Sequence, residues 1–131
     1  MKRIQVLAIA IVVLHIVFSI PHGMAHSDLH IQMALWQNIY IWVVITLLPL
    51  VAAVLIWKRP RTGFLLLLCS MAGSFVFGVF YHFISAGPDN VASHAGHASA
   101  GMFLWTAVLL ALIEAAGFVI GLLGWSRSRQ F

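Results

Sequence analysis

Long apolar segments alternate with short polar ones along this chain, and the alternation predicts four membrane-spanning helices. An α-helix rises about 1.5 Å per residue, so about 20 apolar residues cross a hydrocarbon core that is roughly 30 Å thick. The apolar segments lie at about residues 4–21, 35–57, 62–86 and 102–125. We therefore predict a single four-span membrane domain over residues 1–131, with longer polar loops at 22–34 and 87–101.

The connections between the apolar segments predict two antiparallel hairpins. Pro21 is expected to end or kink the first helix, because proline lacks the backbone N–H that a helix interior uses. The turn at 58–61 is too short for anything but an antiparallel pair, and Gly-Pro-Asp-Asn at 87–90 has strong turn chemistry. The predicted fold class is therefore an all-α, integral membrane four-helix bundle.

The start of the chain also has features of a signal peptide, since Met1-Lys2-Arg3 precedes an apolar run. The residues before Ala25 do not form a clean small-x-small cleavage site. We therefore expect this segment to be retained as the first span.

Composition supports the membrane interpretation and removes several classes of function. The chain is 63% hydrophobic and only 8% charged, whereas soluble globular proteins are roughly one quarter charged. The single cysteine, Cys69, excludes both an internal disulfide and a cysteine-type metal site. The formal net charge of +4 does not indicate nucleic acid binding, because the basic residues lie at the predicted helix ends.

The positions of the basic residues predict the orientation of the bundle. All seven lysines and arginines lie at the chain ends or in the turn between the second and third segments. With four spans these places share one side, and the positive-inside rule makes that side the cytoplasm. We predict cytoplasmic termini and outward-facing loops at 22–34 and 87–101, in a membrane such as the bacterial cytoplasmic (inner) membrane.

Six of the seven histidines gather on the predicted outer side, in or beside the two polar loops. Neutral imidazole is the commonest protein ligand for transition metals, and carboxylates can complete such a site. The leading candidate ligands are His26, His30, His94 and His97. The further ligands or orienting groups are His22, His82, Asp28 and Asp89.

The spacing of these histidines suits chelation, and three metals are candidates. Residues three or four apart share a helix face, so His22 with His26 and His94 with His97 could chelate as pairs. Histidine with methionine favours copper, whereas histidine with aspartate favours zinc or iron. The alternative interpretation is that the histidines are only pH-responsive surface groups or contacts to a partner.

Two ionisable residues, His15 and Glu114, lie inside the predicted spans, where such residues are functional candidates by default. Gly117 and Gly121 permit close helix approach, so Glu114 is expected to point into the bundle. Counted from the predicted outer helix ends, Glu114 lies roughly 18 Å deep and His15 only about 8 Å deep. A direct pair is therefore not expected. Protonated Glu114 is expected to bond to hydroxyls at its own level, which belong to Thr46, Ser70 and Ser74.

Two further roles for the histidines stay open. A proton or ion relay could run inward along the helix face that His15 shares with His22 and His26. A b-type haem would need histidines at similar depth on two helices, and His15 with His82 is the only plausible pair.

No sequence signature names a reaction. The chain has no phosphate-binding glycine loop, no dinucleotide fingerprint and no nucleophile elbow. We interpret it as a small multi-pass membrane protein that binds a transition metal at a histidine-rich outer face, and an enzyme is disfavoured. The alternatives are a non-catalytic accessory subunit of a larger membrane complex and a haem- or metal-dependent membrane oxidoreductase. Because four helices bury little interior within the lipid bilayer, a homo-oligomer or a larger complex is expected.

Overall fold

The computed structural model describes residues 1–128 and is helical throughout its regular elements. Within this range four continuous helical stretches are long and apolar enough to cross a membrane. The first stretch is α1 (Lys2–Asp28). The second comprises α2 (Leu35–Tyr40), the π-helical segment η1 (Ile41–Leu47) and α3 (Leu48–Lys58). The third comprises α4 (Pro60–Val79) and the π-helical segment η2 (Phe80–Ile84), and the fourth is α5 (Ala100–Ser128). The prediction of an all-helical protein with four candidate spans is therefore confirmed.

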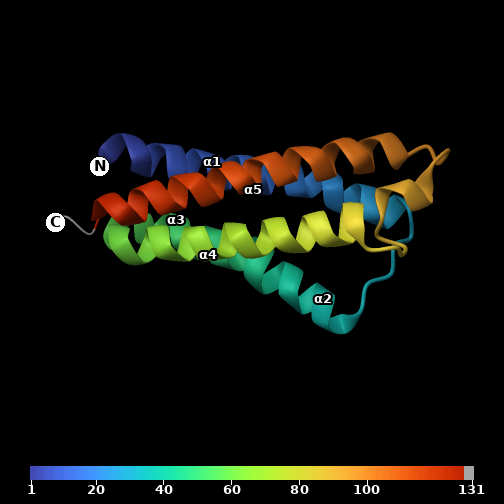
Figure 1. Ribbon diagram of the computed structural model, residues 1–131, viewed down its shortest axis with the longest axis horizontal. Helices are drawn as coiled ribbons and strands as arrows, with labels where there is room; N and C mark the ends of the chain where they lie inside the picture. Colours follow the sequence, from blue (N-terminus) through green and yellow to red (C-terminus); the bar gives the residue numbers. More distant parts are fainter. Residues whose placement is uncertain (129–131) are drawn as a thin grey trace.

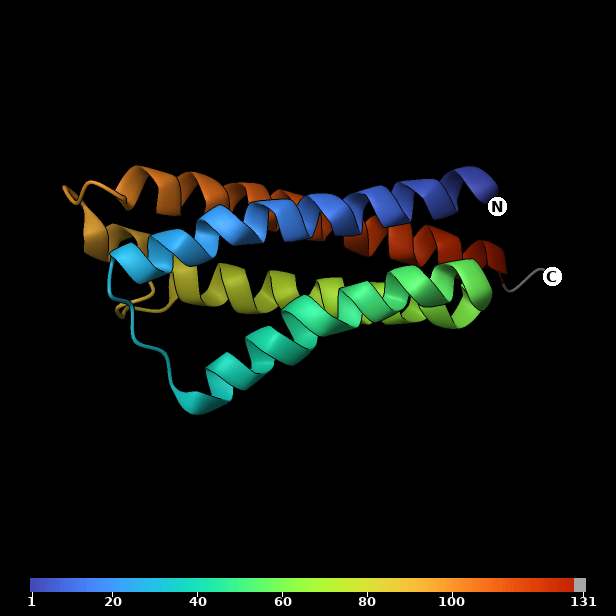
Figure 2. The ribbon, with the colours of Figure 1, turned by 180° about the vertical axis from the view of Figure 1, so that it is seen from behind.

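The four stretches form an elongated bundle (Figure 1). Helix α5 contacts both α1 and α4, and α3 packs on α4. The start of α1 and the end of α5 lie at the same end of the bundle, beside the turn between α3 and α4 (Figures 1 and 2). At the opposite end α2 diverges from α1, and the short 3₁₀ helix η3 (Val91–His94) lies in the connection to α5. The placement of the two ends in the cytoplasm stays a prediction.

The half of the bundle that holds the N-terminus has a dense apolar core. Its buried side chains come from α1, α3 and α4 and include Val12, Ile56, Phe64 and Leu67. Glycines on α5 let that helix approach α4 closely, since a β-carbon at Gly121 would lie 2.8 Å from the backbone nitrogen of Leu68. This half of the bundle is tightly packed, and His22, His26 and His82 lie toward the other end.

We expect Gly121→Ala to lower the free energy of unfolding by about 1–3 kcal/mol, the usual cost of overfilling a packed contact. The added β-carbon meets the backbone of Leu68, which cannot rotate away. Gly101→Ala on the same helix is the matched control, because a β-carbon there would meet nothing within 4 Å in the described chain beyond its sequence neighbours and the adjacent backbone of its own helix. Thermal unfolding in detergent measures both variants, and equal transition temperatures would contradict the close approach.

Helix α1 does not end at Pro21 but continues through it to Asp28. Of the two predicted effects of Pro21, an end or a kink of the helix, the structure excludes the end. A helix that stopped inside the membrane would expose several unsatisfied backbone groups, whereas an internal proline removes only one donor. The continuation takes up the first part of the stretch 22–34 that the sequence indicated as a loop, and it places His22 and His26 on one helix face.

Candidate metal site

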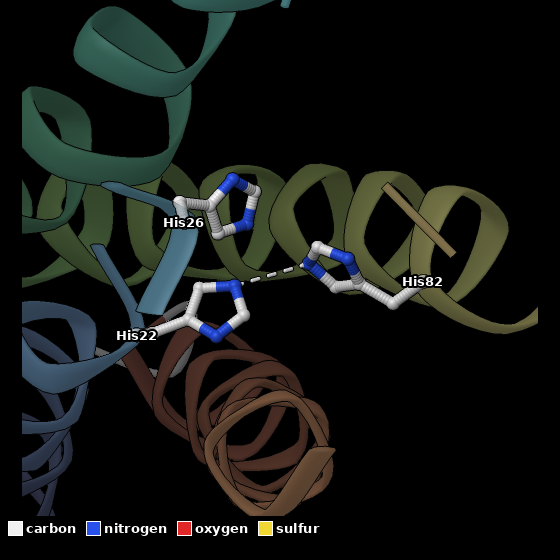
Figure 3. A group of neighbouring side chains, drawn as sticks. All are labelled: His22, His26 and His82. Carbon is white, nitrogen blue, oxygen red and sulfur yellow. Dashed lines mark hydrogen bonds between the residues drawn. The ribbon is translucent and has the colours of Figure 1, made fainter. Parts of the chain in front are cut away.

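Three imidazole rings meet at the end of the bundle away from the N-terminus, and we call them the histidine trio. His22 and His26 come from successive turns of α1, and His82 comes from η2. Each can offer one ring nitrogen such that the three nitrogens lie within 4.8 Å of one another. Figure 3 shows the three rings pointing toward one another across the space between the helices.

The tautomer of His82 follows from its hydrogen-bond partner. Its Nδ1 lies 3.1 Å from the backbone oxygen of Asp89, which can only accept a hydrogen bond. Nδ1 therefore carries the proton and donates it. In the neutral ring this leaves a lone pair on Nε2, which points toward the trio.

The tautomer of His22 follows in the same way from Thr106 on α5. The Thr106 hydroxyl donates to the backbone oxygen of Met102 at 2.7 Å, so its oxygen is free to accept. His22 Nδ1 lies 2.9 Å from that oxygen and donates to it. The Nε2 atom of neutral His22 therefore also carries a lone pair.

These two lone pairs face each other, since His22 Nε2 and His82 Nε2 lie only 3.2 Å apart (Figure 3). Two neutral acceptors at this distance repel unless a cation, either a proton or a metal ion, lies between them. In a tetrahedral zinc site with bonds of about 2.0–2.1 Å, neighbouring ligand atoms are roughly 3.3 Å apart. The observed separation therefore fits two ligands of one metal ion.

A buried carboxylate beside the trio supplies negative charge. Asp89 is only 6% exposed, and its Oδ1 lies 3.3 Å from both His26 Nε2 and His82 Nδ1. Neither carboxylate oxygen makes a well-aligned hydrogen bond to any residue in the range 1–128. A buried carboxylate is costly without a compensating cation. A metal ion on the histidines would provide one.

A buried aromatic ring packs against all three imidazoles. Phe103 of α5 is fully buried, and its ring centroid lies 5.3, 5.0 and 5.3 Å from those of His22, His26 and His82. Such a hydrophobic neighbour limits water access and lowers the local dielectric, which strengthens the interaction of the nitrogens with a cation.

Of the four histidines that the sequence ranked first as ligands, the structure brings only His26 into this group. The others form hydrogen bonds within the loops. His30 Nδ1 bonds to the backbone oxygen of Asp28, and His94 Nε2 bonds to the backbone oxygen of Pro88. His97 accepts from the backbone of Ser99, whose hydroxyl donates to the Asp28 carboxylate. The trio instead uses His22 and His82, which the sequence ranked second, and Asp89 lies beside them.

Deeper in the bundle, His15 Nε2 lies 3.1 Å from Glu114 Oε1, and both side chains are buried. The expectation that Glu114 would bond to hydroxyls is therefore wrong, and Ser70 and Ser74 bond to backbone oxygens of their own helix. The depth estimate failed because α1 extends past Pro21. Counted from Asp28 and from Ala100, His15 and Glu114 each lie roughly 20 Å from the helix end.

The same contacts bear on the haem alternative. His15 is engaged with Glu114, and His82 with His22 and Asp89, so each histidine of the suggested haem pair already has other partners. The structure offers no observation that favours haem ligation.

Comparison with known proteins does not assign a function. No family model, no curated protein and no solved structure matches this chain.

Proposed function

We propose that this membrane protein binds one transition metal ion at His22, His26 and His82. The observation that carries the proposal is the distance of 3.2 Å between His22 Nε2 and His82 Nε2. The Nδ1 atom of each ring donates a hydrogen bond elsewhere, so each Nε2 atom has a lone pair for a metal ion. Asp89 and Thr106 act as positioning residues, because they fix the tautomer and orientation of the ligating rings. Histidines that bind a metal ion usually donate their other ring N–H to such an acceptor.

The donor set favours zinc or iron(II) over copper(I). Three imidazoles beside a carboxylate suit borderline divalent ions, whereas copper(I) prefers sulfur ligands. Met24, the nearby thioether in the sequence, is 57% exposed, whereas the three imidazoles are buried or half-buried. Three protein ligands also leave a fourth position open, which is typical of zinc sites that bind water or a substrate.

The position of the site supports an extracytoplasmic role. The trio lies at the end of the bundle opposite the α3–α4 turn, where Lys58, Arg59 and Arg61 gather. If the basic end faces the cytoplasm, the metal is taken from the outer side. The accessory-subunit and oxidoreductase alternatives, and the oligomeric state, stay predictions.

Elemental mass spectrometry of protein purified in detergent without a polyhistidine tag tests the proposal. We expect about one zinc or iron ion per chain, lost on treatment with a strong chelator and restored by adding the metal. Protons compete with metal for imidazole, so the content should fall as the buffer is acidified. A protein that is empty as purified and takes up no zinc, iron or copper at micromolar concentration would refute it.

A further inference from the structure

Two hollow spaces near the histidine trio share part of their walls, and we call them the inner cavity and the outer pocket. The inner cavity, of about 530 Å³, lies between α1, the diverging α2–η1 segment, α4 and α5, and all three rings of the trio line it. The outer pocket, of about 140 Å³, is lined by residues 32, 33, 37, 81 and 85–89. Of the described residues, only Met33 and Asp89 line both spaces. These two residues therefore form the wall between them.

The outer pocket lies on the side of the loops, within reach of water. Most of its lining comes from residues 32–33 and 85–89, which lie beyond the ends of the neighbouring candidate spans. Gln32 and Pro88 at its rim are exposed, and Gln37 adds a second polar side chain. The volume of this pocket is sufficient for a cation together with several of its waters.

The inner cavity gives an ion no comparable way in from its other side. It lies between candidate spans, and Trp42, which lines it, is 70% exposed, so this side faces lipid hydrocarbon. The side chains of Ile20, Ile41 and Ile45 add to its apolar lining. An ion without its water is strongly disfavoured in such surroundings. A cation that binds to the trio therefore has to arrive from the side of the loops.

The charge at the shared wall suits a cation. Asp89 belongs to that wall and also contacts the trio, since its Oδ1 lies 3.3 Å from His26 Nε2. No lysine or arginine is among the residues that line either space in the range 1–128. Both oxygens of the Asp89 carboxylate are covered, so the wall is closed and has to open before an ion can pass.

Met33 is the part of the wall that can move most readily. It lies in the irregular stretch between α1 and α2, and its backbone oxygen accepts a hydrogen bond from Asn38 Nδ2 at 3.2 Å. The methionine side chain is unbranched and has three rotatable bonds, so it can swing aside while this bond holds the backbone. Asp89, in contrast, lies against two imidazoles, those of His26 and His82.

We propose that the outer pocket is the entrance through which a divalent cation reaches the histidine trio, and that the Met33 side chain is its gate. This inference rests on the proposed metal site and adds the route to it. The cation gives up part of its water in the outer pocket, passes Met33 and reaches the imidazoles beside Asp89. Because the gate makes no bond to the bound ion, it changes the rates of binding and release by the same factor and leaves the affinity unchanged.

Zinc exchange measured in both directions tests the proposal, on chelator-treated protein in lipid nanodiscs, where the exposed side of the inner cavity stays in lipid. Stopped-flow mixing with a chromophoric zinc indicator gives the rate of uptake, and transfer from zinc-loaded protein to excess chelator gives the rate of release. Shortening the gate in Met33→Ala should raise both rate constants at least about fivefold and keep the affinity within about twofold. Met33→Phe has a larger and stiffer side chain and should slow both steps. Slower exchange at unchanged affinity cannot come from a misfolded site.

Two control variants separate the proposed route from the alternative one. Trp42→Ala widens the inner cavity on its lipid side, and Met24→Ala shortens an exposed methionine that is not among the residues lining either space. Both should exchange zinc at the rates of the unchanged protein.

The outcomes distinguish failure of this inference from failure of the metal site. Normal zinc affinity with equal rates in the unchanged protein and Met33→Ala would overturn the entrance and leave the metal site intact. Faster exchange in Trp42→Ala but not in Met33→Ala would also overturn it, because the ion would then enter from the lipid side. A protein that takes up no zinc would refute both proposals.

Discussion

Changing His22 and His82 together to alanine is expected to remove the bound metal. A structural zinc site with four ligands is worth roughly 10–16 kcal/mol, so each ligand contributes on the order of 3 kcal/mol. The loss of one ligand then weakens binding about 100-fold, and the loss of two leaves no stoichiometric metal at micromolar concentration. Competition with a chromophoric chelator and elemental mass spectrometry measure the change.

The matched control removes the three loop histidines. His94 and His97 are changed to alanine, and His30 to asparagine, because His30 has a positive φ of 54° that asparagine tolerates better than alanine. This triple variant should keep its metal, since none of the three belongs to the trio. The opposite result, with metal lost in the loop variant and kept in the trio variant, would place the site in the loops.

The helical architecture could be predicted because its cause is local. A bilayer requires every spanning backbone group to be satisfied within its own segment, so length and apolarity alone define a span. The stretches from Leu35 to Lys58 and from Pro60 to Ile84 correspond closely to the predicted segments. The end of α1 was missed because proline is treated as a helix terminator, whereas lipid favours continuation of the helix past Pro21.

The composition of the site could be predicted only in part, because it depends on contacts between helices. The spacing of His22 and His26 indicated a chelating pair, conditional on the helix continuing past Pro21. No local signal identifies the third ring, because His82 is 60 positions from His22 in the chain and meets it only through a tertiary contact between the two rings. The sequence favoured the loop histidines as ligands because they are close together in the chain. In the structure, His30, His94 and His97 instead form hydrogen bonds to backbone groups of their own loops.

Replacing Glu114 by leucine is expected to lower the stability of the bundle by about 1–2 kcal/mol. His15 is fully buried, and its Nε2 bonds to Glu114, while its Nδ1 has no partner among residues 1–128. Leucine at position 114 therefore leaves the buried imidazole without any hydrogen bond. Stranding a buried polar group costs about 1–3 kcal/mol. Hydrogen bonds between membrane helices lie toward the low end, because the unfolded state in lipid also finds partners. Thermal unfolding in detergent measures the loss.

The double variant His15→Leu with Glu114→Leu separates the pair from general packing. Removing both polar groups leaves nothing unsatisfied, so it should be more stable than Glu114→Leu alone although it carries one more substitution. Glu114→Gln keeps an acceptor for His15 Nε2 and should unfold close to the unchanged protein. If the two single losses simply add in the double variant, then His15 and Glu114 do not interact. The coupling between α1 and α5 at this depth would then come only from apolar contacts.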